Sequence, residues 1–349
     1  MKLFTPLLAL LIVATAIAQE VPETIFSSWK EKVDPSVERG LDFLARIQQD
    51  DGSFPENYGT STGIPALAGM AFLSRGHLPT EGEYAETLTR IIDYILSHQD
   101  RQGLYQAGHG GSGPMYAHNI ATLFISEVSG MVDPARQKKI GESLPRALGL
   151  ILRAQAVKKS DRHQGGWRYH PGSRDSDTSC SGWALMALRS AKLNGAAVPD
   201  KAIDDAVAYL YRHFDPKGGH FGYTDTHKHQ LSLTGMGLLC LELCGEHGKP
   251  ETRKAADYVL QNFRRLENDQ FSFYGNYYNA QAMFQMGGKY WGTYASWMYS
   301  TYLKSQKEDG SWYSKEGGRI YGTSIMILAF TVPYRQLPIY QRDETVDED

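Results

Sequence analysis

Six helical stretches along this chain each run into a polar turn that is rich in Gln or Asp and closes on a glycine, usually with an aromatic residue. The turns cover residues 48–54, 99–105, 155–167, 215–221, 268–271 and 306–312, the fifth being degenerate. Gly52 belongs to the first turn and Gly310 to the last, so five intervals give a period of about 52 residues. A period of this size indicates repeated supersecondary units that bury their apolar faces against one another.

Each repeated unit contains two kinds of helix. In the first unit, Val37, Leu41 and Leu44 recur at helical spacing between charged residues, which predicts an amphipathic helix starting near Pro35. Residues 64–73 are apolar nearly all round and predict a helix buried on every side. The amphipathic type returns at residues 85–96, 144–153, 203–210, 255–263 and 294–303, and the apolar type at 120–128, 182–188, 231–243, 280–286 and 323–330.

This alternation predicts an all-α fold, an (α/α)6 toroid of six helical hairpins with apolar helices inside and amphipathic helices outside. An open solenoid is the alternative, but solenoids normally need polar capping repeats. The last apolar helix, residues 324–330, is as apolar as the others, which favours closure. We expect the toroid to span residues 37–332, between an N-terminal extension at 19–36 and a C-terminal tail at 333–349. In the turns, Gln and Asp should bond free backbone groups and the aromatic residues should wedge between units.

The first 18 residues have the pattern of a signal peptide. Lys2 provides a positive charge, an apolar run follows, and Ala16-Ile17-Ala18 fits a cleavage site before Gln19. We therefore expect an exported protein, periplasmic or secreted, unless the segment is kept as an anchor. No later stretch predicts a transmembrane helix in the mature chain.

Charge and cysteine content narrow the function classes. The formal net charge is −3, and no basic run predicts binding to nucleic acid. Three cysteines do not build a disulfide framework, and Cys240 and Cys244 lie four apart in an apolar helical pattern, as small buried side chains do. The sequence predicts no cofactor, and it leaves the oligomeric state open.

Three of the units contain a longer pattern around the turn. The first has Arg39-Gly40, Phe43-Leu44, Gln48 and Gly52-Ser53-Phe54; the third has Arg146-Ala147, Gln155 and Gly166-Trp167, with Leu150 in place of the aromatic; the sixth has Tyr302-Leu303, Gln306 and Gly310-Ser311-Trp312. This pattern resembles the QW repeat of squalene–hopene and oxidosqualene cyclases, which prenyltransferase β subunits share more loosely, and it extends over residues 37–332. The resemblance implies a toroid and a polyprenyl or triterpene-like substrate. Squalene–hopene cyclases have two toroid-like domains, so this chain is similar to a single-toroid member of the terpene cyclase and prenyltransferase/squalene oxidase repeat family.

In a ring of hairpins, all inner helices start at the same end, and that mouth is where a site is expected. The polar residues just before or within the inner-helix starts are Thr60, Ser61, Thr62, His109, Tyr116, His118, Asn119, Asp175, Asp177, Thr178, Asp225, His227, His229, Tyr277, Tyr278, Asn279, Gln281, Arg319 and Tyr321. We select Tyr116, His118, Trp167, Asp225, His227, His229, Tyr278 and Tyr321 as candidate binding residues.

Asp175 and Asp177 are the candidate catalytic residues. Asp175-Ser176-Asp177-Thr178 resembles the D-x-D-D motif of class II terpene cyclases, whose middle acid protonates an alkene or epoxide. The resemblance places Asp177 in the position of this proton donor, although Thr178 replaces the last acid. The alternative is that Asp175 or Asp177 caps the inner helix that begins near Thr178.

Two further readings concern metal and aromatic residues. Asp225, His227 and His229 have the side-chain types of an open zinc site, but a histidine pair two residues apart in a Gly-rich segment is more often a surface feature, and we predict no metal. The aromatic residues between Tyr274 and Trp297 either pack the ring or line a hydrophobic or sugar-binding pocket.

Three functions follow. The first is an exported terpene-cyclase-like toroid that binds a polyprenyl or triterpene-like substrate, with Asp177 as proton donor. The second is a non-catalytic toroid that binds a ligand or protein. The third is a glycan hydrolase or lyase, in which Asp177 and Asp225 would face each other about 6.5–9.5 Å apart across the mouth.

Overall fold

The computed structural model describes residues 7–55, 61–108 and 113–341, with side chains from residue 25 onward. Thr60, His109 and residues 1–6 of the expected signal peptide lie outside this part. The outer helices are α1 (Leu7–Ile47), α3 (Ala85–Ser97), α5 (Pro134–Ala156), α7 (Asp200–Arg212), α9 (Pro250–Asn262) and α11 (Gly288–Tyr302). The inner helices are α2 (Gly63–Ser74), α4 (Met115–Glu127), α6 (Thr178–Leu193), α8 (Gln230–Leu243), α10 (Ser272–Met286) and α12 (Gly318–Phe330).

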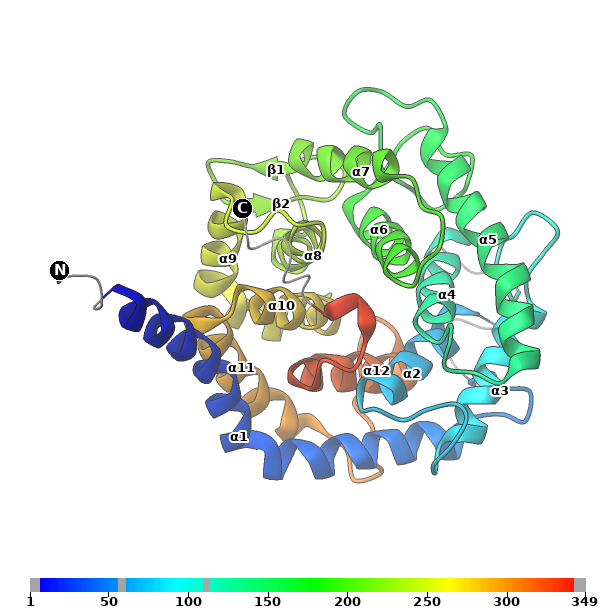
Figure 1. Cartoon of the computed structure of the whole chain (residues 1–349), viewed down its shortest axis with the longest axis horizontal. Helices are drawn as coiled ribbons and strands as arrows, with labels where there is room; N and C mark the ends of the chain where they lie inside the picture. Colours follow the sequence, from blue (N-terminus) through cyan, green and yellow to red (C-terminus); the bar gives the residue numbers. More distant parts are fainter. Residues whose placement is uncertain (1–6, 56–60, 109–112, 342–349) are drawn as a thin grey trace, which may run out of the picture.

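The inner helices close into a ring. Each contacts the next in order from α2 to α12, and α12 in turn contacts α2, as Figure 1 shows. The predicted (α/α)6 toroid is therefore confirmed, and the open solenoid is not formed. The remaining elements are short: strands β1 (Phe214–Asp215) and β2 (His220–Phe221), which pair antiparallel, and 3-10 helices η1 (Phe263–Asn268), η2 (Leu303–Ser305), η3 (Val332–Tyr334) and η4 (Pro338–Tyr340).

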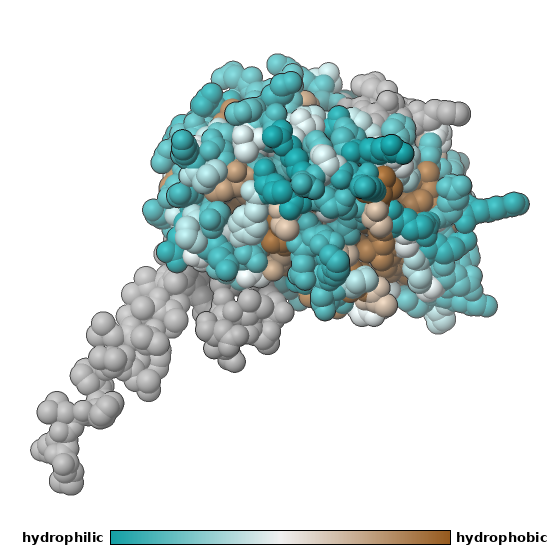
Figure 2. Space-filling view, turned by 90° about the horizontal axis from the view of Figure 1, so that it is seen from above, coloured by the Kyte–Doolittle hydropathy of each residue, from teal (hydrophilic) through white to brown (hydrophobic). Residues whose placement is uncertain are grey.

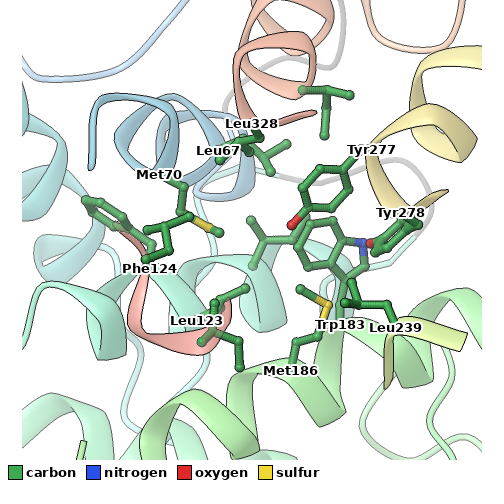
Figure 3. Packing of buried hydrophobic residues seen from close by; sticks show 14 of the residues in the cluster. Leu67, Met70, Leu123, Phe124, Trp183, Met186, Leu239, Tyr277, Tyr278 and Leu328 are labelled. Atoms are coloured by element: carbon green, nitrogen blue, oxygen red, sulfur yellow. The ribbon is translucent and has the colours of Figure 1, made fainter. Parts of the chain in front are cut away.

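Burial follows the two helix types. Every residue of α2 except Ile64 is buried, whereas on α3 the buried side chains are confined to one face, Leu88, Ile91, Ile92, Tyr94 and Ile95. Side chains from all the inner helices meet in the middle of the ring, among them Leu67, Phe124, Trp183 and Leu239 in Figure 3. On the side of the toroid that Figure 2 shows, the surface is mainly hydrophilic with smaller apolar areas, as expected for amphipathic outer helices.

The first helix is longer than the sequence suggested. We expected it to start near Pro35, but α1 begins at Leu7 and continues past Pro35 to Ile47. A proline inside a helix removes one backbone hydrogen bond and crowds the preceding turn. Packing offsets this cost, because Trp29 lies against Tyr299 of α11 with ring centroids 5.8 Å apart, and Phe26 lies edge-on to Tyr334 at 5.0 Å.

The repeated turns join neighbouring units. The side-chain amide of Gln155 donates to the carbonyl oxygens of Gly165 in its own turn, at 2.9 Å, and of Ala202 in the next outer helix, at 2.8 Å. Gln99 and Gln306 make the equivalent pairs of bonds, and Gln306 reaches Ser36 of α1. The indole of Trp312 donates to the carbonyl of Tyr302 at the end of its own outer helix. These contacts confirm the structural role predicted for the turns, and the last turn closes the ring onto the first helix.

The two ends of the ring differ. Residues 332–341 pack against the C-terminal ends of the inner helices, where Ile339 and Tyr340 are buried. The backbone N–H of Ile339 donates to Glu127 of α4 at 3.3 Å, and Gln285 of α10 donates to the carbonyl of Tyr340 at 3.1 Å. This part of the expected C-terminal tail is therefore an ordered cover, and the opposite end of the ring is left for a site. No helix in the described ranges is long and apolar enough to cross a membrane.

Candidate functional site

A cavity of about 550 Å³ lies at the N-terminal ends of the inner helices, where the topology predicted the mouth. A volume in this range suits a small-molecule ligand. Its described lining consists of Ser61, Gly63, Ile64, Leu67, Gly113, Tyr116, Ala117, Ile120, Tyr169, Ser179, Trp183, Tyr223, His229, Ser232, Leu233, Phe271, Tyr274, Glu316 and Tyr321.

The cavity has an apolar floor and a more polar rim. Leu67, Ile120, Trp183 and Leu233 come from the second turns, or the end of the first turn, of α2, α4, α6 and α8, and all four are buried. The residues with hydroxyl, imidazole or carboxyl groups lie earlier in the helices or in the loops before them. Because every inner helix starts at this end, a residue further along its helix lies deeper in the cavity.

Asp177 lies behind the cavity wall. It is fully buried, does not line the cavity, and caps α6 by accepting a hydrogen bond from the backbone N–H of Cys180 at 2.8 Å. The Ser179 hydroxyl donates to the same oxygen at 2.6 Å, and Arg168 donates to the other oxygen at 3.0 Å. Burial raises the pKa of Asp177, while these three donors oppose the rise. The helix-capping interpretation is therefore correct for Asp177.

Asp175 is more exposed than Asp177. Its side chain is half exposed, and one oxygen lies 3.3 Å from Nε of Arg168. Arg168 thus contacts both acids. Asp175 pairs with the guanidinium group of Arg168 and makes no direct contact with the carboxyl group of Asp177. Thr178, in the place of the third acid of the resembled motif, donates to the carbonyl of Gly222 at 2.7 Å and ties α6 to the segment after β2.

Two hydrogen-bonded chains connect Asp177 with the cavity. In the first chain, Ser179 bonds to the hydroxyl of Tyr116. In the second, Arg168 donates to the hydroxyl of Tyr223 at 3.1 Å, and Tyr223 bonds to the hydroxyl of Tyr169. All four hydroxyl-bearing residues line the cavity. The buried carboxylate therefore orients hydroxyl groups that a ligand would meet.

Glu316 is a lining residue that sequence reasoning missed. It lies in the turn before α12, where its carboxyl oxygens accept from the backbone N–H groups of Phe273 at 3.1 Å and Tyr274 at 3.2 Å, at the start of α10. Ser314 donates to it at 3.1 Å. Burial raises the pKa of Glu316 to about 7 in spite of these bonds. Among the described lining residues it is the only acid.

The sequence did contain a signal for this position. Glu316 stands in a short polar turn before an inner helix, as the other candidates do, but in this unit Arg319 and Tyr321 are the residues named from the sequence, and Tyr321 alone is selected. Arg319 is exposed, pairs with Asp309 and stacks on Phe43, outside the cavity. Tyr321 does line the cavity.

The structure brings Tyr116, His229 and Tyr321 to the cavity, but not the remaining candidates. His118 is buried against the outer layer, where Nδ1 accepts from the N–H of Tyr105 at 3.1 Å. Its Nε2–H therefore donates to the carbonyl of Ala147, and burial lowers its pKa to about 4. Trp167 is also buried, and its indole donates to the carbonyl of Ile151 at 2.8 Å. Both side chains belong to the joints between units.

Tyr278, Asp225 and His227 do not line the cavity. Tyr278 is buried in the ring centre, edge-on to Trp183 with centroids 5.6 Å apart, as Figure 3 shows. Asp225 accepts from the backbone N–H of His227 at 2.7 Å in a turn, and His227 is exposed. His229 alone of this trio reaches the cavity, where it stacks edge-on to Phe271 at 5.0 Å. In the described part of the chain, no three His, Cys, Asp or Glu side chains come together as a set that could hold a metal ion.

Comparison with known proteins supports the fold. No known family model and no curated protein sequence matches the chain. Among solved structures, the chain is similar to a variant of the type II terpene cyclase MstE from Scytonema in complex with geranylgeranyl dihydroxybenzoate, with a TM-score of 0.60 and 12% identity over 88% of this chain and 98% of that one. It is similar to an α-1,6-mannanase from Salegentibacter, with a TM-score of 0.62 and 9% identity over 87% and 99%. A reducing end xylose-releasing exo-oligoxylanase matches with a TM-score of 0.53 and 14% identity over 88% and 93%.

At such low sequence identity, these structural similarities show the fold alone. The chain shares its single toroid with a terpene cyclase and with glycan hydrolases, so the architecture is compatible with a hydrophobic or a glycan ligand. The choice between a hydrophobic and a glycan ligand therefore depends on the residues that line the cavity.

Proposed function

We propose that this chain binds an elongated apolar small molecule of the isoprenoid type in the ring cavity, with the polar end of the ligand at the rim. The single observation that carries this proposal is the distribution of side chains in the cavity. Leu67, Ile120, Trp183 and Leu233 form an apolar floor, and most of the other large side chains on the wall are aromatic. Such a surface gains free energy by covering apolar ligand surface, at about 25 cal/mol per Å². Export by means of residues 1–18 belongs to the same proposal.

A glycan hydrolase finds less support in this cavity. Inverting hydrolysis needs two carboxyl groups about 6.5–9.5 Å apart across the scissile bond. The expected pair, Asp177 and Asp225, does not line the cavity, and Glu316 is the single acid among its described lining residues. The cavity floor also offers few hydrogen-bonding groups for sugar hydroxyls.

Ligand binding also finds more support than cyclisation started by Asp177. Protonation of an alkene requires a strong acid that is held in its protonated form. Burial raises the pKa of Asp177, but its carboxyl group receives three hydrogen bonds, one of them from Arg168, and all three oppose protonation. A proton from Asp177 would have to pass through Ser179 and Tyr116 to reach a ligand. We therefore propose binding as the function, with Asp177 as an organising residue of the cavity wall.

The proposal is tested by calorimetric titration of the purified protein with geranylgeraniol and with α-1,6-mannotriose. We expect the prenyl ligand to bind and the glycan not to bind. Leu67→Ala removes floor contacts and should weaken prenyl binding about tenfold, because burying a leucine side chain contributes roughly 1.5–3 kcal/mol. Leu193→Ala is the matched control, since Leu193 is an exposed leucine at the far end of α6. Binding of the mannotriose without the prenyl ligand would refute the proposal.

A further inference from the structure

The hydrogen bonds around Asp177 have fixed directions, and these directions determine what the cavity wall can offer to a ligand. An arginine only donates, an ionised carboxylate only accepts, and a hydroxyl group donates one proton and can accept as well. Arg168 and Asp177 are 3.0 Å apart, so the guanidinium group donates to the carboxyl group and opposes its protonation. Both chains that lead from this ion pair to the cavity can therefore be followed atom by atom.

The first chain ends in an acceptor. Ser179 donates its single proton to Asp177 Oδ1. In the contact between Ser179 and Tyr116, the proton must then come from Tyr116. The hydroxyl proton of Tyr116 is used in the bond to Ser179, and the phenol oxygen still has a lone pair that can accept a hydrogen bond from a ligand.

The second chain ends in a donor. Arg168 donates to the hydroxyl oxygen of Tyr223 at 3.1 Å, and its guanidinium group also lies over the rings of Tyr169 and Tyr223. Tyr223 accepts this bond, and its hydroxyl shares one hydrogen bond with the hydroxyl of Tyr169, in which either group can donate. Two hydroxyl protons serve this one bond, so one proton of the pair is left for a ligand, and it is the proton of Tyr169 when Tyr223 donates.

The acceptor and the donor lie side by side. The rings of Tyr116 and Tyr169 have centroids 5.7 Å apart and planes inclined by 33°, and both residues line the cavity. We infer that Tyr116 and Tyr169 together bind a hydroxyl group of the ligand, which makes an isoprenoid alcohol the class of ligand that this cavity recognises. This inference rests on the proposed function, because the apolar floor holds the chain of the same ligand.

A carboxylate, an ammonium group or a hydrocarbon satisfies at most one side of this pair. A carboxylate accepts from Tyr169 but cannot donate to Tyr116. An ammonium group donates to Tyr116 but cannot accept from Tyr169, and it would approach Arg168. A hydrocarbon gives no hydrogen bond to the lone pair of Tyr116 or to the free proton of Tyr169, so it gains nothing from this pair. Of these four ligand ends, the alcohol is the one that can both donate to Tyr116 and accept from Tyr169.

The experiment uses four probes with the same C15 chain: farnesol, farnesene, farnesoic acid and farnesylamine. Their affinities for the full-length protein are measured by calorimetry at neutral pH. We expect farnesol to bind at least tenfold more tightly than the other three. Tyr116→Phe and Tyr169→Phe each keep the ring and remove one hydroxyl, so each should weaken farnesol about 5–10-fold and leave farnesene unchanged. The two tyrosines belong to separate chains, so either variant tests the inference if the other fails to fold.

Leu67→Ala is the matched control, because it should weaken farnesol and farnesene by the same factor. Equal affinity for farnesol and farnesene would overturn the inference and leave the proposed function intact, as would a preference for the acid or the amine. Phe variants that weaken farnesol and farnesene equally would also overturn it. If none of the four probes binds, the proposed function itself fails.

Discussion

At the scale of single residues, two buried carboxyl groups differ in role because the groups around them differ. Asp177 is surrounded by donors and orients the cavity wall, whereas Glu127, on the covered side of the ring, has fewer donors. Glu127 accepts from Ser190 and from the N–H of Ile339, and burial raises its pKa to about 7. The sequence could point to Asp177 because it lies in a motif, but burial and partners, which set the charge of Glu127, come from tertiary packing.

Glu127 should make the stability of the fold depend on pH. Its folded pKa of about 7 lies above the ordinary value of 4.5, so the folded state binds more protons than the unfolded state between these two values. The free energy of unfolding should therefore fall as pH rises from 4.5 to 7, by about 3 kcal/mol for this group. Glu127→Gln keeps an acceptor without the charge, so urea denaturation at pH 5 and pH 8 should show a smaller difference than in the parent protein.

Glu142, an exposed glutamate on α5, provides the control for this prediction. Glu142→Gln should leave the difference between pH 5 and pH 8 as it is in the parent protein. Glu316, whose pKa is raised in the same direction, should supply part of the difference that remains in Glu127→Gln. If Glu127→Gln does not stabilise the protein at pH 8, the carboxyl of Glu127 is not held in the way described.

At the scale of elements, the sequence predicted what is local and repeated. Helix type followed from apolar periodicity, and the joints followed from the glutamines and aromatic residues of the turns, because these groups bond within one or two units. The beginning of α1 was missed, since a proline normally starts a helix and here the contacts of Trp29 and Phe26 with distant residues override it. Glu316 was missed because its burial depends on α10 of the preceding unit.

The glycines of the turns make a prediction at this scale. Gly103 has a φ of +98°, and a Cβ atom there would lie 2.3 Å from the carbonyl oxygen of Arg146 in the next outer helix. Gly82 has a φ of +89°, but a Cβ atom there would meet nothing within 4 Å. Gly82→Ala should therefore cost about 1 kcal/mol for the backbone conformation alone. Gly103→Ala should cost about 2–4 kcal/mol, because the two units must also move apart. Equal losses in chemical denaturation would mean that the turn does not hold the units in contact.

At the scale of the whole molecule, closure distinguishes this fold from an open array of repeats. In an open array, each unit contacts only its neighbours and the terminal units can unfold alone. Here the last turn and α12 contact α1 and α2, so both ends of the toroid have a neighbour. Closure also places all the inner-helix starts around one mouth, which allows Tyr116 of the second unit and Tyr321 of the sixth to line the same cavity.

Closure predicts that the contact between the last turn and α1 stabilises the fold as much as a contact between two internal units. Gln306 donates to Ser36 at 2.7 Å, as Gln155 donates to Ala202 at 2.8 Å. Gln306→Ala and Gln155→Ala should each lower the free energy of unfolding by about 2 kcal/mol or more, since each removes two hydrogen bonds to backbone carbonyls. Gln306→Ala also removes the oxygen that accepts from Ser36 and Arg39. Unfolding followed by circular dichroism should remain a single transition in both variants. A much smaller loss for Gln306→Ala, or an early separate transition of the terminal helices, would show that the ring opens at this joint before it unfolds.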